Sequence, residues 1–393
     1  MSNPNDEFSF RYFPENFMWS QGMTLAIEMA RWGCSAMSEV DRVGRRLKGR
    51  IGDGQAWGAE WEKEARRVER MGAEAAAERH FLTAGAHYLR AATYYFVGER
   101  YAPQGKIKDQ LYEESLRCFA IAFQWRHPNI EKVKVRYEGT TLPALFMKAR
   151  GVAGRAPAVC FFDGFDMAKE FSVLFGGVEL ANRGIHTLAI DGPGQGEALR
   201  LQNMPARYDY EVPAAAAYDY VAGRDDVDPK RVGLMAFSLG GYYAPRAAAF
   251  EKRFAACVAW GAHWDYHAVW AERRKHLEAG GNKTPAPYYQ LKWVMGEQDM
   301  DAAMKKLERF TLEGVAGKIA CPTLVMHGER DTLVPVGIAH KLYDAVGAKT
   351  KQLKVFTAEE GGAEHCQTDN RLLAANYAAD WLADTLGATP PQL

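Results

Sequence analysis

Strand-like and helix-like segments alternate along the middle of the chain, and this alternation constrains the fold more than any other feature. Short apolar runs are typical of buried strands, and longer amphipathic runs between them are typical of helices. The strand-like runs are 156–162, 186–190, 232–237, 255–260, 322–327 and 353–357, and the helix-like runs are 168–183, 208–222, 242–250 and 372–386. We therefore expect an α/β fold with a mostly parallel sheet and helices on both faces.

The first third of the chain carries no convincing strand. From about 14 to 126, apolar and charged residues recur at three- and four-residue spacing, which predicts helices over 16–30, 57–71, 73–98 and 106–123. The stretch 80–101 resembles one helix pair of a tetratricopeptide array, but such arrays need about three repeats. We favour a helical domain over 1–128 rather than a peptide-binding module.

Two further segments complete the predicted organisation. Residues 131–137 and 142–148 predict two strands joined by a turn, and 129–260 with 314–393 would form the sheet-bearing core. Between the two parts of the core, 261–313 is rich in Trp, Tyr, His and charge and predicts inserted helices. An insertion at this point would cover the carboxyl ends of the strands, so we predict a cap that controls access.

Composition excludes several classes of partner. Lys plus Arg and Asp plus Glu each number 49, so the chain has no basic field to attract nucleic acid or anionic lipid. The six cysteines are scattered, and the chain shows neither a secretory leader nor an apolar run of membrane-spanning length. We expect a cytoplasmic protein that acts on a small molecule without a cofactor. A homodimer stays open.

A serine stands where a strand passes into a helix. The stretch 231–243 reads RVGLMAFSLGGYY, so Ser238 follows an apolar run and precedes Gly240 and Gly241. This resembles the G-x-S-x-G nucleophile elbow with Ala236 in place of the first glycine, and alanine is small enough for a close turn. A serine before two glycines is otherwise an ordinary turn, so the functional interpretation depends on residues farther along the chain.

A base and an acid lie downstream of the serine. A serine hydroxyl needs a base beside it, and the base needs a carboxylate to fix its tautomer. Asp331 lies just after the strand-like run 322–327, and His365 lies on the loop after 353–357. Each residue alone would be a solvated turn or a surface histidine, but the order Ser238, Asp331, His365 predicts a catalytic triad. Glu329 is the rival acid and comes too early in its loop.

An acyl-transfer site also needs donors for the developing oxyanion. The backbone N–H of Leu239 directly follows the serine, and Phe165 follows Gly164 on the loop after the strand-like run 156–162. We predict these two N–H groups as the oxyanion hole. Asp163 and Asp166 flank the second donor, and each would cap a helix or contact substrate, with capping favoured.

Two other motifs are weighed and set aside. The stretch 191–196, DGPGQG, has the spacing G-x-G-x-G and contains Pro193, so it fits a structural turn beneath the site rather than a dinucleotide loop. His263 and His267 have the four-residue spacing of metal ligands, but no zincin pattern surrounds them, and we predict no metal. Cys366 is interpreted as a packing residue.

The motifs AFSLGG, DGPGQGEAL and HGERD, with the late run EEGGAEH, resemble those of the α/β-hydrolase superfamily. Together with the helical first third, FFDGFDMAKEF and WGAHWDY, they resemble more narrowly the 2,6-dihydroxypseudooxynicotine hydrolase branch and the fungal polyketide-shortening hydrolases of the yellowish-green pigment type. The resemblance implies an α/β-hydrolase fold with an N-terminal helical domain and an inserted helical cap. It also implies hydrolysis of a carbon–carbon bond next to a ketone, in a 1,3-dicarbonyl, aryl-ketone or polyketide-like substrate.

The resemblance carries the triad onto Ser238, Asp331 and His365, and the oxyanion hole onto Phe165 and Leu239. It further implies a cap-side acid, for which Glu272 and Asp265 are the candidates. The substrate contacts that we predict are Asp163, Asp166, Trp264, Asp265, Tyr266, His267 and Glu272.

Other functions use the same residues. An ester, lactone or peptide hydrolase needs the same triad, and so does an acyltransferase or cyclase in which a substrate hydroxyl replaces water. A non-enzymatic scaffold built on an inactive hydrolase is disfavoured because no triad member is missing.

Overall fold

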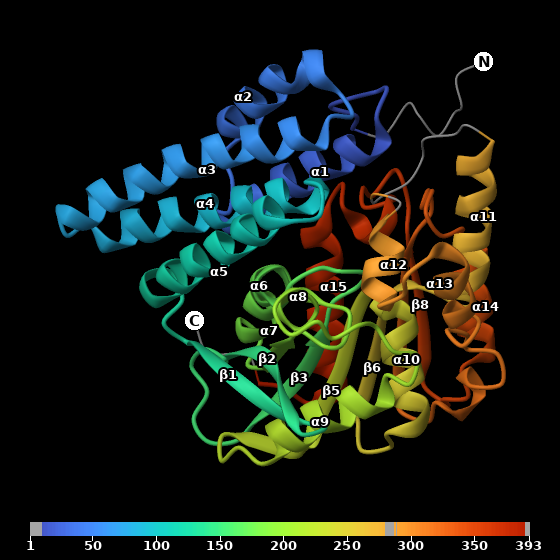
Figure 1. The fold of residues 1–393 in the computed structure, drawn as a ribbon. Coiled ribbons are helices and arrows are strands. Elements are labelled where there is room, and N and C mark those ends of the chain that lie inside the picture. The colour runs from blue at the N-terminus through green and yellow to red at the C-terminus, as the bar shows by residue number, and fades with distance from the viewer. Residues whose placement is uncertain (1–9, 280–286, 288, 390–393) are drawn as a thin grey trace. The chain divides into compact units, whose positions relative to one another are not determined.

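The computed structural model describes residues 10–279, 287 and 289–389 of the 393. The chain forms two compact units, a helical one mainly of residues 6–130 and a sheet-bearing one mainly of 131–275 and 289–393 (Figure 1). The predicted domain boundaries at 128, 260 and 313 stay predictions. Among the described helices, none has the length and apolar character needed to cross a bilayer.

The helical unit is built around a cluster of aromatic rings. Its helices are α1 (Phe17–Glu28), α2 (Met37–Leu47), α3 (Gly54–Ala77), α4 (Phe81–Tyr101) and α5 (Lys106–Arg126). Trp57 and Trp61 lie one turn apart on α3 and are fully buried, with ring centroids 5.7 Å apart. Trp19 from α1 packs on Trp57 at 4.8 Å, so the aromatic spacing that predicts these helices also forms their core.

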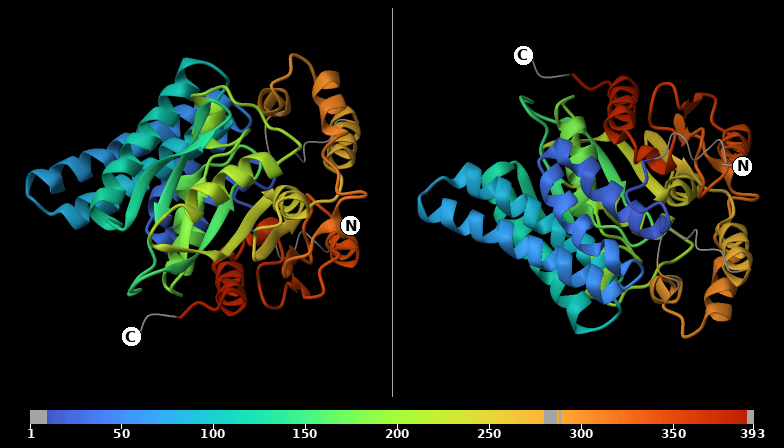
Figure 2. Two further views of the ribbon diagram at one scale, coloured as in Figure 1. Left: turned by 90° about the horizontal axis from the view of Figure 1, so that it is seen from below. Right: turned by 90° about the horizontal axis from the view of Figure 1, so that it is seen from above.

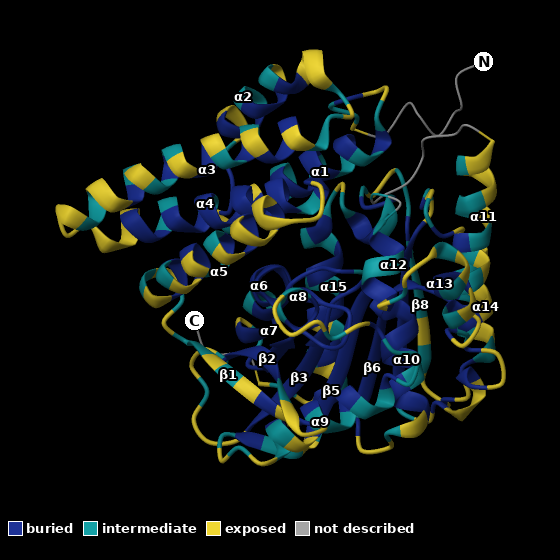
Figure 3. Cartoon of the chain, viewed as in Figure 1, coloured by how far each residue is buried: buried dark blue, intermediate teal, exposed yellow. Residues whose placement is uncertain are grey.

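The sheet of the second unit has eight strands in the order β1-β2-β4-β3-β5-β6-β7-β8. The strands are β1 (Ile130–Tyr137), β2 (Thr140–Met147), β3 (Ala156–Phe162), β4 (His186–Ile190), β5 (Val227–Leu239), β6 (Ala256–Ala262), β7 (Thr323–Gly328) and β8 (Lys351–Phe356). Strand β2 runs antiparallel to β4, and from β4 to β8 all neighbours are parallel. Strands β3, β4 and β6 are buried along their whole length, and β3 and β6 appear dark blue in Figure 3. The predicted mostly parallel sheet is therefore confirmed.

Helices cover both faces of this sheet (Figure 2). They are α6 (Lys169–Ser172), α7 (Val178–Ala181), α8 (Gly196–Arg200), α9 (Glu211–Ala222), α10 (Gly240–Phe250), α14 (Gly337–Ala345) and α15 (Arg371–Leu386). A π-helical turn, Val173–Gly177, joins α6 to α7. On one face α9 and α10 pack on β5, and on the other α15 packs on β5 and β6 next to α7. The segment between β6 and β7 contains α11 (Tyr266–Glu278), α12 (Tyr289–Met295) and α13 (Met300–Leu307), so the inserted helices are present.

Candidate active site

Ser238 occupies a sharp turn at the end of β5. Its φ angle is +59°, in the left-handed region that residues other than glycine seldom adopt, and helix α10 begins two residues later. Such strained backbone persists only where the surrounding structure enforces it, and it is concentrated at functional sites. The predicted strand-to-helix elbow is therefore present.

Small residues around Ser238 allow this turn to be tight. A Cβ atom added at Gly240 would lie 2.6 Å from the Cβ of Ala236, and one added at Gly241 would overlap the carbonyl oxygen of Gly261. Ala236 itself is fully buried and pairs in the sheet with Phe162 of β3. The alanine that replaces the first glycine of the pattern is thus accommodated because Gly240 leaves room for its methyl group.

The three predicted triad side chains lie in one hydrogen-bonded chain. The Oγ atom of Ser238 lies 2.9 Å from Nε2 of His365, and Nδ1 of His365 lies 2.6 Å from Oδ2 of Asp331. Because a carboxylate only accepts, Nδ1–H donates to Asp331, and Nε2 accepts from the serine hydroxyl. The sheet brings together Ser238 at the end of β5 with residues that follow β7 and β8, in the geometry that general-base activation of a serine requires. Their catalytic role stays a prediction.

Asp331 is held by more donors than the histidine alone. Its Oδ1 accepts from the backbone N–H groups of Leu333 at 2.8 Å and Val334 at 2.9 Å. Burial alone would raise the pKa of Asp331, but His365, His327 and the Val334 N–H lower it below the usual value. Burial would likewise lower the pKa of His365, and the facing Asp331 carboxylate instead raises it above 6.5. The ionised acid therefore stabilises an imidazolium.

His327 is a residue of this site that the sequence pattern did not single out. Its Nδ1 accepts from the N–H of Ala262 at 3.1 Å, and its Nε2–H donates to the carbonyl of Val334 at 2.8 Å. The same Nε2 lies 3.3 Å from Oδ2 of Asp331. A histidine as a late residue of a buried strand, four positions before the acid, is the signal that could have revealed it. The rival Glu329 instead accepts from Ala358 N–H at 3.0 Å on an exposed loop.

The backbone around Gly164 lies directly against the serine. A Cβ atom added at Gly164 would lie 2.7 Å from Cβ and 3.2 Å from Oγ of Ser238, so only glycine fits. Phe165 follows on the same loop after β3, and Leu239 lies at the N-terminus of α10. Both predicted oxyanion donors therefore flank the serine, and their role stays a prediction.

Comparisons with known proteins agree with this geometry. Residues 176–389 match the sequence model of the prolyl oligopeptidase family. The chain belongs to this family. Its fold matches the crystal structure of the 2,6-dihydroxy-pseudo-oxynicotine hydrolase at a TM-score of 0.77 with 24% identity, covering 93% of this chain and 98% of that one. A structure of AbyA5 matches at 0.72 with 18% identity over 95% of each chain.

The curated relatives are hydrolases that span most of the chain. The 2,6-dihydropseudooxynicotine hydrolase of Paenarthrobacter nicotinovorans is 28% identical, covering 92% of this chain and 93% of the relative. Hydrolase LUC6 of a Fusarium species is 28% identical, covering 87% and 90%. The 20-hydroxy-prefusarin hydrolase FUS2 of Gibberella moniliformis is 25% identical, covering 86% and 90%. This family member is therefore a hydrolase.

The two aspartates that flank Gly164 are both buried. The carboxyl group of Asp163 accepts a hydrogen bond from the hydroxyl of Ser172. Burial, followed by the charge of Asp191, raises the pKa of Asp163 well above its usual value. The predicted capping role is therefore wrong for Asp163. Its hydrogen bond comes from the side chain of Ser172 and not from a backbone N–H at the start of α6. Asp166 has a φ of +60°, and its carbonyl accepts from Arg200 at 2.9 Å.

Aromatic rings connect the histidine to the oxyanion loop. The ring of His263 lies 6.2 Å from that of His365 and 5.4 Å from that of Tyr266. Tyr266 and Trp270 in turn lie 6.3 Å and 5.8 Å from the ring of Phe165. We call these four rings, His263, Tyr266, Trp270 and Phe165, the aromatic row. His263, Tyr266 and Trp270 are buried, and Phe165 is half-buried.

The remaining predicted contacts have other partners. Asp265 accepts from the N–H of Ala268 at 2.9 Å and so caps α11, and its predicted contact with substrate stays a prediction. The side chain of Glu272 is 78% exposed and pairs with Lys275 at 3.2 Å, and its predicted role as a cap-side acid stays a prediction. Trp264 is buried in the apolar core, and His267 is half-buried on α11.

One of the six cysteines, Cys366, lies beside the histidine of the site. The Sγ atom of Cys366 lies 3.5 Å from Nε2 of His365 and 3.6 Å from the carbonyl of Trp260, and all six cysteines are free. Within the described ranges, no group of three or more His, Cys, Asp or Glu side chains could hold a metal ion.

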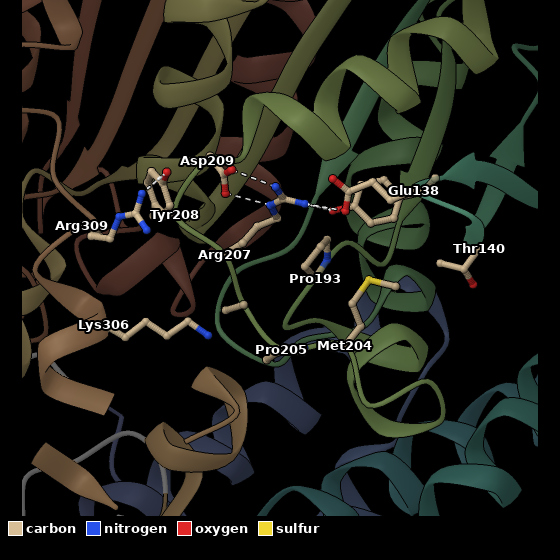
Figure 4. A pocket seen from close by; sticks show the side chains of 12 residues that line it. Glu138, Thr140, Pro193, Met204, Pro205, Arg207, Tyr208, Asp209, Lys306 and Arg309 are labelled. Atoms are coloured by element: carbon tan, nitrogen blue, oxygen red, sulfur yellow. Dashed lines mark hydrogen bonds and ion pairs between the residues drawn. The ribbon is translucent and has the colours of Figure 1, made fainter. Parts of the chain in front are cut away.

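A pocket of about 400 Å³ is lined by apolar and charged side chains (Figure 4), and no triad residue is among those that line it. Arg207 stands between Asp209 and Glu138 and bonds to both at 2.8 Å. Arg309 stacks on the ring of Tyr208 at 3.6 Å. The charges that line this pocket are therefore largely paired with one another.

Proposed function

We propose that this chain is a serine hydrolase that cleaves a carbon–carbon bond next to a ketone. Its substrate would be a 1,3-dicarbonyl, aryl-ketone or polyketide-like compound. The hydrogen-bonded chain Ser238–His365–Asp331 carries the proposal, because it supplies a nucleophile, a base and an ionised acid in contact. The relatives named for a pseudooxynicotine and a prefusarin supply the substrate class.

The geometry supports a two-step reaction. His365 removes the proton of Ser238 at Nε2 while the serine oxygen attacks the ketone carbon, and Asp331 stabilises the imidazolium. The N–H groups of Phe165 and Leu239 hold the oxyanion. When the carbonyl reforms, the carbon–carbon bond breaks, its electron pair passes into an enolate, and the imidazolium returns a proton. Water, deprotonated by His365, then hydrolyses the acyl-enzyme.

Cleavage of an ester or lactone is the second candidate, because it needs the same residues. The aromatic row beside the triad favours a planar substrate in either case.

We further propose a small-molecule substrate, a cap function for 261–313 and a cytoplasmic location. The six free thiols support the location, because disulfides are rare in a reducing compartment.

Replacement of Ser238 tests the proposal. We expect Ser238→Ala to lower turnover of an aryl 1,3-diketone by about a thousandfold or more while the circular dichroism spectrum stays unchanged. Ser38→Ala, at an exposed serine of α2, is the matched control and keeps full turnover. Product analysis on paired diketone and ester substrates decides between the two candidates. Turnover of the Ser238 variant near the wild-type value would contradict both.

A further inference from the structure

Gln195 is a buried glutamine whose amide contacts the oxyanion loop. It lies in the DGPGQG stretch and is fully buried. Its Oε1 accepts from the N–H of Gly192 at 2.9 Å, and its Nε2 donates to the carbonyl of Asp163 at 2.5 Å and lies 3.5 Å from that of Gly164. One amide therefore joins the loop after β4 to the loop after β3.

The carbonyl of Gly164 and the N–H of Phe165 belong to one peptide group. In a trans peptide, the C=O and N–H bonds point in opposite directions across the plane. Nε2 attracts the carbonyl oxygens of Asp163 and Gly164 to its own side, so the N–H of Phe165 turns to the other side. Because the backbone at Gly164 abuts Ser238, that side can face the oxyanion.

We propose that Gln195 is a positioning residue that aims the N–H of Phe165 at the oxyanion. The inference rests on the proposed function. Gln195 does not touch the reacting atoms, and it acts through the peptide group between Gly164 and Phe165. An oxyanion donor must lie within about 0.3 Å of its ideal distance to be fully effective, so the anchor of this peptide matters for rate.

The loop that carries Gln195 is itself firmly anchored. The carboxylate of Asp191 accepts from the backbone N–H groups of Lys169 and Glu197, each at 2.8 Å, and from Nζ of Lys169 at 2.8 Å. Side chains of Asp191 and Lys169 are fully buried, so these charge-assisted bonds are screened little by water. A glycine is required at 196, because a Cβ atom there would overlap the Asp191 carboxylate. Gln195 is therefore a fixed donor.

Gln195→Met tests the inference, because methionine keeps the length of the side chain and removes both polar groups. The probe is a fluorophosphonate, which reacts with an activated serine through a transition state that places an oxygen in the oxyanion hole. We expect the second-order rate of Ser238 labelling to fall by about 10- to 100-fold, less than the 10²- to 10³-fold for loss of a whole donor. Gln352→Met, at a glutamine of β8 bonded to Tyr377, is the control and keeps the wild-type rate.

A second readout separates positioning from a purely structural role. An aryl trifluoromethyl ketone forms a tetrahedral oxyanion with Ser238, whereas the corresponding secondary alcohol has the same ring and no electrophilic carbon. We expect Gln195→Met to weaken inhibition by the ketone by about the same factor as labelling and to leave inhibition by the alcohol unchanged. Equal weakening of both compounds would overturn the inference, and so would labelling within twofold of wild type.

The wild-type protein supplies a test that does not depend on the variant being folded. In a crystal structure of the fluorophosphonate adduct, we expect the phosphonyl oxygen to accept from Phe165 N–H while Nε2 of Gln195 still bonds to the carbonyl of Asp163. An adduct that lacks one or both of these hydrogen bonds overturns the inference. Absence of any label on wild-type Ser238 would instead contradict the proposed function, so the two failures are distinguishable.

Discussion

At the level of single residues, the charge of Asp331 determines when His365 can act as a base. The carboxylate raises the pKa of His365 above 6.5, so the neutral imidazole forms only at higher pH. We expect the rate of fluorophosphonate labelling to rise with pH along a limb whose apparent pKa exceeds 6.5. In Asp331→Asn the limb should move to lower pH and the plateau fall by about 10⁴-fold, since the tautomer is no longer fixed.

Glu329→Gln is the matched control for this experiment, because it removes the rival acid of the same loop. Its carboxylate bonds to Ala358 and not to the histidine, so the limb should stay in place. If the limb moved in the Glu329 variant and not in the Asp331 variant, Glu329 rather than Asp331 would be the acid that acts on His365.

His263 makes the folded protein sensitive to acid. Burial, with the nearby His365, lowers the pKa of His263 from 6.5 to about 3, whereas the unfolded chain binds a proton near 6.5. The stability that the neutral ring contributes is therefore complete above pH 6.5 and is lost as the pH falls toward 3, at up to about 1.4 kcal/mol per pH unit. We expect the urea midpoint of His263→Asn to depend less steeply on pH in this range.

Circular dichroism measures these midpoints, and His340→Asn, at an exposed histidine of α14, is the control. The control should keep the full pH dependence of the wild type. An identical slope for the His263 variant would show that other groups cause the acid sensitivity.

At the level of elements, the start of α10 depends on the close approach of β6. Gly241 and Gly337 both lie in the first turn of a helix of the same unit, where alanine is usually better by about 1 kcal/mol. A Cβ atom at Gly241 would overlap the backbone oxygen of Gly261, whereas one at Gly337 would meet nothing within 4 Å. We expect Gly241→Ala to lower the free energy of unfolding by about 3 kcal/mol or more, and Gly337→Ala to raise it slightly.

Urea titration of the two glycine variants measures this difference in sign. Labelling of Ser238 should also be lost in Gly241→Ala, because the elbow would have to move. Destabilisation of equal size in both variants would mean that helix geometry, rather than the contact with Gly261, sets the cost.

The elements that the sequence predicts best are the buried strands. The runs 156–162 and 186–190 are confirmed with the same bounds. A strand of a sheet covered on both faces is buried on both sides, so it appears in the sequence as a short, continuous apolar run between turns. The predicted break near residue 72 is wrong, since α3 continues to Ala77. A Cβ atom at Gly72 would lie 3.0 Å from the ring of Tyr88, so this glycine permits close packing of α4. Helix α14 was not predicted from the sequence. It buries only Ala339 and Leu342, and two buried residues are too few to show a helical period.

The order of the site residues is predictable because parallel strands end at one edge. Ser238 and His365 are 127 positions apart, yet Ser238 lies at the end of one strand and His365 follows another strand of the same sheet. The contacts of Gln195 and His327 are not predictable in this way, because they join loops whose relative positions depend on the finished sheet. The sequence motifs therefore predict the triad residues, whereas the residues that position them can be identified only in the three-dimensional structure.

At the level of the whole molecule, each of the two units has its own buried core. Trp61 of α3 is fully buried beside Trp57 and Tyr94 in the helical unit, and Leu234 of β5 is buried in the apolar core of the sheet. We expect Trp61→Ala to cost about 3–5 kcal/mol and Leu234→Ala about 2–5 kcal/mol, each within its own unit. Hydrogen–deuterium exchange measured by mass spectrometry should show faster exchange of α3 and α4 in the first variant and of β3, β5 and β6 in the second. Faster exchange of both units in both variants would contradict separate cores and would mean that the chain unfolds as one cooperative unit.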